Sequence, residues 1–122
     1  MKILISDPIA EEGKELLKTR GFEVDEKTGL TEDELVLIIP HYDGIIVRSA
    51  TRVTRRVIDA ATNLKVIGRA GVGLDNIDLD AAKERDIRVF NAPGGTTISV
   101  AELTMGMIIA CTRSIPEATL SI

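Results

Sequence analysis

Three short segments carry polar or charged side chains, two of them together with glycines, and these are the places where the chain could do chemistry. They are Arg48–Thr51, Gly68–Gly73 and Asn91–Thr97, and the first two each carry an arginine. The planar guanidinium of arginine matches two oxygens of a carboxylate or phosphate at once. Glycines leave backbone N–H groups uncovered, and these can also hold an anion. The pattern therefore predicts a site for a small anion.

A plainer interpretation stands beside this one. A single arginine at the end of a strand is more often a solvated charge or a surface salt bridge. Glycines in such loops can serve tight turns alone. The residue types support the two interpretations about equally. The anion site requires Arg48 and Arg69 to lie close together.

Other kinds of site find less support in the sequence. Gly71–Gly73 begins like a dinucleotide fingerprint, but Asn76 stands where the third glycine belongs, and the segment does not follow a first strand. The chain has one His, His41, and one Cys, Cys111, so it lacks the set of His and Cys ligands that a zinc site uses. No Ser–His pair can be assembled on strand ends. We therefore expect no metal site and no catalytic residue in this chain.

The elements that would position these loops follow from five short apolar runs that alternate with amphipathic segments. Strands are expected at Lys2–Ser6, Phe22–Asp25, Ile45–Val47, Leu64–Gly68 and Ile87–Phe90. Apolar strands of this kind predict a parallel sheet with helices on both faces. We expect a flavodoxin-like α/β fold with strand order 2-1-3-4-5, in which ligands bind beyond the carboxyl ends of the strands. Arg48 and Arg69 would then leave adjacent strands, so that their guanidinium groups could converge.

The helices between these strands carry start and stop signals. They are expected over about Pro8–Thr19, Thr31–Ile39, Thr54–Ala61, Asp78–Arg85 and Ser99–Thr112. Thr31 and Glu34 have capping-box spacing, and Asp7 and Asp78 are residue types that cap free N–H groups. Gly21 supplies a stop.

Composition limits the classes of function. A chain of 122 residues with 44% apolar and 28% charged residues fits one globular domain, and its net charge of −4 disfavours nucleic-acid binding. No stretch reaches the roughly 20 apolar residues that span a bilayer. Asp7 interrupts the N-terminal apolar run too early for a signal peptide. A single cysteine favours a reduced, cytoplasmic protein.

The strand-end motifs resemble those of the D-isomer-specific 2-hydroxyacid dehydrogenases, specifically their N-terminal substrate-binding part. The resemblance rests on Ile45–Val53, Val66–Asp78, Asn91–Thr104 and Arg113–Thr119, and it runs in order through nearly the whole chain. Within the family, it is greatest to the members that oxidise 3-phosphoglycerate to 3-phosphohydroxypyruvate with NAD, in serine synthesis.

The resemblance implies roles for individual residues. The two arginines would meet the anionic groups of the substrate, and two backbone N–H groups after the fourth strand would hold its carboxylate. Val72 would also lie near the nicotinamide of the cofactor. The residues expected to contact the substrate are Arg48, Ser49, Arg69, Val72, Gly73 and Thr96.

The resemblance also implies that the chain is incomplete as an enzyme. Residues 1–98 would form the substrate-binding domain, and residues 99–122 a long interdomain and oligomerisation helix that stops before the nucleotide-binding domain. We expect neither bound NAD nor activity in the isolated chain. The helix is apolar on most sides, which predicts a homodimer through residues 99–115, with exchange of this helix between protomers as one form.

One alternative is a stand-alone flavodoxin-like binding module, such as a phospho-receiver. A receiver needs a phospho-accepting Asp at the end of the third strand, together with further acidic residues that bind Mg²⁺. Arg48 stands at that position and carries the wrong charge for this chemistry.

Overall fold

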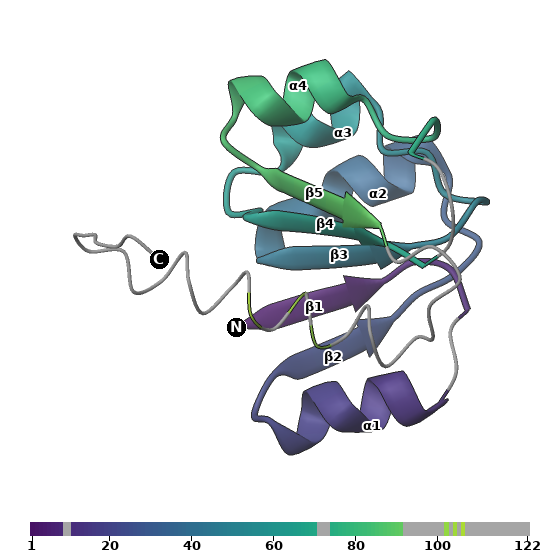
Figure 1. Cartoon of the computed structure of the whole chain (residues 1–122). Coiled ribbons are helices and arrows are strands. Elements are labelled where there is room, and N and C mark those ends of the chain that lie inside the picture. The colour runs from purple at the N-terminus through teal and green to yellow at the C-terminus, as the bar shows by residue number, and fades with distance from the viewer. Residues whose placement is uncertain (9–10, 71–73, 92–101, 103, 105, 107–122) are drawn as a thin grey trace, which may run out of the picture.

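The computed structural model contains one parallel five-stranded sheet (Figure 1), described over residues 1–8, 11–70 and 74–91, with single residues at 102, 104 and 106. The strand order is β2-β1-β3-β4-β5, and every neighbouring pair is parallel. The predicted α/β fold and strand order are thus confirmed. The strands are β1 (Lys2–Ile5), β2 (Glu23–Glu26), β3 (Gly44–Val47), β4 (Val66–Arg69) and β5 (Arg88–Asn91).

Helices cover both faces of the sheet, with α2, α3 and α4 on one face and α1 on the other (Figure 1). Side chains alternate along the strands, so the inner strands β1, β3 and β4 contribute to two cores. Ile45 and Val47 pack with the three-helix side, whereas Ile46, between them, packs with Leu17 of α1. The helical elements are α1 (Glu11–Thr19), α2 (Glu32–Ile38), the 3-10 turn η1 (Ile39–His41), α3 (Arg55–Ala60) and α4 (Leu79–Glu84).

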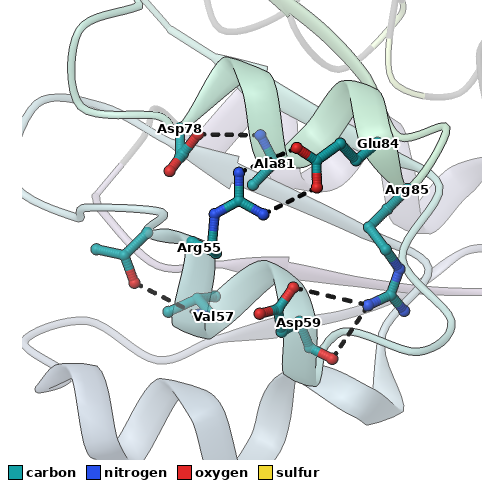
Figure 2. Close-up of polar contacts among 8 residues, drawn as sticks. Arg55, Val57, Asp59, Asp78, Ala81, Glu84 and Arg85 are labelled. Atoms are coloured by element: carbon teal, nitrogen blue, oxygen red, sulfur yellow. Dashed lines mark hydrogen bonds and ion pairs between the residues drawn. The ribbon is translucent and has the colours of Figure 1, made fainter.

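Local signals in the sequence start and stop these helices as predicted. The Thr31 hydroxyl accepts from the Glu34 backbone N–H, and the Glu34 carboxylate accepts from the Thr31 N–H, which is the complete capping box. The Asp78 carboxylate accepts from the Ala81 N–H and caps α4 (Figure 2). Gly21 has a φ of 93°, the left-handed conformation that ends α1 at little cost.

Most element boundaries differ from the prediction by one or two residues, and two of these differences have a clear cause. Leu64 is buried but precedes β4, because its N–H closes the turn after α3 by donating to the Ala61 carbonyl. Pro8 is not helical, and the first described helical residue of α1 is Glu11. In both cases the residue type fits the adjoining turn as well as it fits the predicted element. Leu64 is apolar like a strand residue, and Pro8 is a residue type common at helix starts.

Ion pairs join α3 and α4 across their exposed surfaces (Figure 2). The Arg55 guanidinium donates to both carboxylate oxygens of Glu84, at 2.9 and 3.2 Å. The Arg85 guanidinium lies 4.0 Å from the Asp59 carboxylate. Such exposed pairs contribute little to stability individually.

Because Gly68 of β4 has no side chain, other residues can approach the strand closely on the face that carries α1. A Cβ atom placed on Gly68 would lie 2.8 Å from Phe90 Cζ and 3.2 Å from Thr104 Oγ1. Thr104 is fully buried, so this strand position lies against a segment far along the chain.

The outer strands of the sheet carry charged side chains. Strand β2 contains Glu23, Asp25 and Glu26, and β5 begins with Arg88. In the part of the chain that the structure describes, no helix is long and apolar enough to cross a membrane.

Candidate functional site

The candidate site lies at the carboxyl edge of the sheet, where the loops after β1, β3 and β4 meet. Val47 pairs in register with Arg69, and Arg48 is the next residue after Val47. The two arginines therefore leave adjacent strand ends at the same edge, as the strand order requires. The predicted convergence of their guanidinium groups stays a prediction.

A buried carboxylate after β1 organises the loop after β3. Asp7 is 3% exposed, and its Oδ2 accepts from the backbone N–H groups of Arg48 at 2.7 Å and of Thr51 at 3.0 Å. Its Oδ1 accepts from the Thr51 hydroxyl at 2.7 Å. Three donors thus surround a carboxylate that would be costly to bury alone.

Asn76, in the loop before α4, contacts the same segment from the other side. Its side-chain N–H₂ donates to the carbonyl oxygens of Arg48 and Thr51, both at 2.7 Å. Its Oδ1 accepts from Arg69 Nε at 2.9 Å. One amide side chain therefore connects the loop after β3 with the last residue of β4.

The Arg48–Thr51 loop is consequently held at both of its ends. Asp7 binds the N–H groups of its first and last residues, and Asn76 binds their carbonyl groups. Ser49 and Ala50, between them, are exposed. The loop thus presents its tip while its ends are fixed, which is the preorganisation that a binding loop needs.

The two arginine side chains have different surroundings. Arg48 is exposed, and its Nη1 lies 3.4 Å from the Pro8 carbonyl, at the long limit of a hydrogen bond. Arg69 is only 8% exposed and is oriented through its Nε by Asn76. Arg48 can turn toward a ligand with little loss, whereas Arg69 supplies a positive charge whose position is set beforehand.

A hollow of about 240 Å³ lies beside this loop, lined by Asp7, Pro8, Arg48, Ser49 and Ala50. Its walls come from the ends of β1 and β3. Between these strands the chain changes direction across the sheet, because β2 lies on one side of β1 and β3 on the other. Parallel sheets bind ligands at such a switch point. The hollow therefore has the position and the size of a site for a small molecule.

A larger hollow of about 350 Å³ lies on the far side of Ala50 and Thr51, against the start of α2. Glu32 forms part of its wall. Hydrogen bonds from the Thr54 hydroxyl and then from the Arg56 guanidinium lower the pKa of Glu32, so this carboxylate is ionised at neutral pH. Arg52 also lines this hollow and Arg56 pairs with Glu32, so its charges are balanced; the smaller hollow is the better candidate because it lies at the switch point between β1 and β3.

The sequence-predicted site residues divide into two groups. Arg48, Ser49 and Arg69 lie at the carboxyl edge as described above. The other three, Val72, Gly73 and Thr96, lie outside the described residues, as does most of the predicted helix 99–115.

Three residues of the site were not recognised from the sequence. Asp7 was interpreted as a helix cap and Asn76 only as a missing glycine, while Thr51 had no role assigned. The available signal was a polar side chain directly after a buried strand, at an edge where polar residues from several strands meet. Among the described residues, no group of three His, Cys, Asp or Glu side chains gathers as a metal site.

Comparisons with known proteins place the chain in a family. Residues 3–120 match the family described as D-isomer specific 2-hydroxyacid dehydrogenase, catalytic domain. The chain is 54% identical over all 122 residues to D-3-phosphoglycerate dehydrogenase of Methanocaldococcus jannaschii, covering 23% of that protein. It is 47% identical over 121 residues to hydroxypyruvate reductase of Thermotoga maritima, covering 99% of this chain and 40% of that protein.

A solved structure is similar as well. The NAD⁺-bound 3-phosphoglycerate dehydrogenase of Entamoeba histolytica superposes with a TM-score of 0.71 at 35% identity, over 90% of this chain and 38% of that one. The chain thus spans less than half the length of each of these three relatives.

Proposed function

Because the chain belongs to the D-isomer specific 2-hydroxyacid dehydrogenase family, we propose that the carboxyl edge of its sheet binds the substrate, a small anionic 2-hydroxy acid. The preferred substrate in this proposal is 3-phosphoglycerate, which the name of the M. jannaschii relative indicates. The observation that carries the proposal is the hollow between the ends of β1 and β3, with Arg48 on its wall and Arg69 oriented at the next strand end.

The chemistry of binding follows from these side chains. The Arg48 guanidinium donates two parallel N–H groups to a carboxylate or phosphate of the ligand. Ser49 adds a hydroxyl at the exposed loop tip. Asp7 also lines the hollow, but the three hydrogen bonds that its carboxylate accepts disperse part of its negative charge and so limit its repulsion of the anion. Val72, Gly73 and Thr96 remain proposed contacts of the same ligand.

The described residues do not fit a dinucleotide cofactor. In a dinucleotide fingerprint a glycine stands at the position that Asn76 occupies, and the Asn76 amide is engaged by Arg48, Thr51 and Arg69. We therefore derive no step through NAD in this chain. The E. histolytica relative holds NAD⁺, and in our proposal hydride and proton transfer depend on groups other than those described.

Two further proposals concern the oligomeric state and the location of the protein. The homodimer through residues 99–115 and the cytoplasmic location remain predictions from the apolar helix and the single cysteine. Light scattering during size-exclusion chromatography tests the first, and a monomer at tens of micromolar would contradict it.

Calorimetric titration with 3-phosphoglycerate tests the binding proposal. Arg48→Ala should weaken binding by roughly tenfold or more, because hydrogen bonds to charged groups are the strong ones. Arg88→Ala is the matched control, since it removes the same charge from an exposed side chain at the opposite edge of the sheet. Equal affinities of wild type and Arg48→Ala, or no binding by wild type, would refute the proposal.

A further inference from the structure

We infer that Asn76 is a positioning residue for substrate binding: it couples the Arg48–Thr51 loop to Arg69, so that both arginines face one anion. This inference rests on the proposed function, because it assigns the geometry of that same site. Asn76 would touch the residues that bind the substrate rather than the substrate itself.

The orientation of the Asn76 amide follows from the chemistry of its neighbours. The carbonyl oxygens of Arg48 and Thr51 can only accept hydrogen bonds, so they must face the Asn76 N–H₂ group. Arg69 Nε–H can only donate, so it must face Oδ1. A reversed amide would place oxygen against oxygen twice and N–H against N–H once. Both amide N–H groups are thus used in a single arrangement.

The backbone of Asn76 is itself fixed against the loop after β3. The Asn76 carbonyl accepts from the Val53 N–H at 2.9 Å, and the Val53 carbonyl accepts from the Asp78 N–H at 2.9 Å. These bonds belong to the parallel bridge between Val53 and Ile77. The side chain therefore extends from a fixed backbone, and its three hydrogen bonds set the position of the Arg48–Thr51 loop relative to the Arg69 side chain.

Replacement by aspartate separates the two contacts of Asn76. In Asn76→Asp one carboxylate oxygen still accepts from Arg69 Nε, but the other lies against the carbonyl oxygens of Arg48 and Thr51, where it repels both. The loop loses its anchor while Arg69 keeps its own. Asn76→Ala removes both contacts. Asp75→Asn is the matched control, because it is an amide–carboxylate exchange at the adjacent, exposed position.

Nuclear magnetic resonance titration of ¹⁵N-labelled protein with 3-phosphoglycerate provides the test. In Asn76→Asp we expect the affinity to fall about five- to tenfold. The Arg69 Nε–H should stay hydrogen-bonded and slow to exchange with water in the ligand-free variant, while the amide signals of Ser49 and Ala50 shift. In Asn76→Ala the affinity should fall similarly and the Arg69 Nε–H should exchange faster than in wild type. Asp75→Asn should match wild type in all three respects.

The possible outcomes separate this inference from the proposed function. If wild type and both Asn76 variants bind with affinities within about twofold of one another, the positioning role is wrong and the binding function stands. If wild type does not bind, the function is refuted and the inference with it. A variant that loses the dispersed signals of the sheet is unfolded, and the other Asn76 variant then decides the question.

Discussion

Replacing the buried carboxylate of Asp7 tests whether hydrogen bonding to that side chain fixes the Arg48–Thr51 loop. In Asp7→Asn the amide oxygen can take the place of Oδ2 and accept from the two backbone N–H groups. The amide nitrogen then faces the Thr51 hydroxyl, which can accept from it and donate to the Ser6 carbonyl, 3.3 Å away. Each donor that engaged the carboxylate keeps a partner, and the negative charge is lost.

Asp7→Leu has a similar shape but no acceptor. The N–H groups of Arg48 and Thr51 then lose their partner, and an unsatisfied donor costs about 1–3 kcal/mol. Both groups lie near the surface, so water relieves part of the loss, and the lower half of that range gives about 3 kcal/mol for the two together. For Asp7→Asn we expect about 1 kcal/mol, the difference between a charged and a neutral acceptor.

Urea unfolding followed by circular dichroism measures both free energies, and an unchanged slope indicates that the denatured state is unaltered. Asp75→Asn, at an exposed position, should stay within about 0.5 kcal/mol of wild type. If Asp7→Leu is no less stable than Asp7→Asn, the hydrogen bonds to the loop are not what the carboxylate contributes.

Two further predictions concern the core. Burial, and then the hydrogen bond to Asp25, raise the pKa of Tyr42 above its usual value. The free energy of unfolding should therefore be unchanged below the unfolded-state pKa of about 10. Above that pH it should fall, by at most about 1.4 kcal/mol per pH unit. Tyr42→Phe should flatten this fall in urea unfolding at pH 9–11, and an equal slope in both proteins would contradict the assignment to the chain's single tyrosine. Gly68→Ala should lower the free energy of unfolding by about 1–2 kcal/mol because its methyl group meets Phe90 and Thr104. Adding Phe90→Leu should recover part of this stability. If Gly68→Ala is as stable as wild type, the neighbouring side chains move aside easily and the prediction is wrong.

Much of the fold could be predicted because its determinants are local. The run Ile45–Val47 has three β-branched residues after Asp43-Gly44, which indicates a strand, and Thr31 with Glu34, three residues away, indicates a helix start. The strand order was expected by analogy with flavodoxin-like sheets rather than worked out from the residues. Boundaries were less certain where a residue such as Leu64 is buried without belonging to the strand.

The site was harder to predict because its contacts join distant positions. Asp7 binds residues 41 and 44 positions away, and Asn76 binds residues 25 and 28 positions away. Asp7 precedes a helix, so its residue type already had a local explanation as a cap. Arg48 and Arg69 were recognised because the expected strand order brings two arginines to adjacent strand ends, whereas a single one would have been explained as a solvated charge.

The charges on the outer strands bear on how the protein behaves in crowded solution. An uncovered strand edge is a template onto which another chain can add, and this is the usual start of aggregation. At neutral pH a second copy approaching β2 edge to edge would bring its own acidic strand against Glu23, Asp25 and Glu26. Mutual repulsion of these carboxylates discourages such stacking, so growth of the sheet from one molecule into the next is opposed at that border.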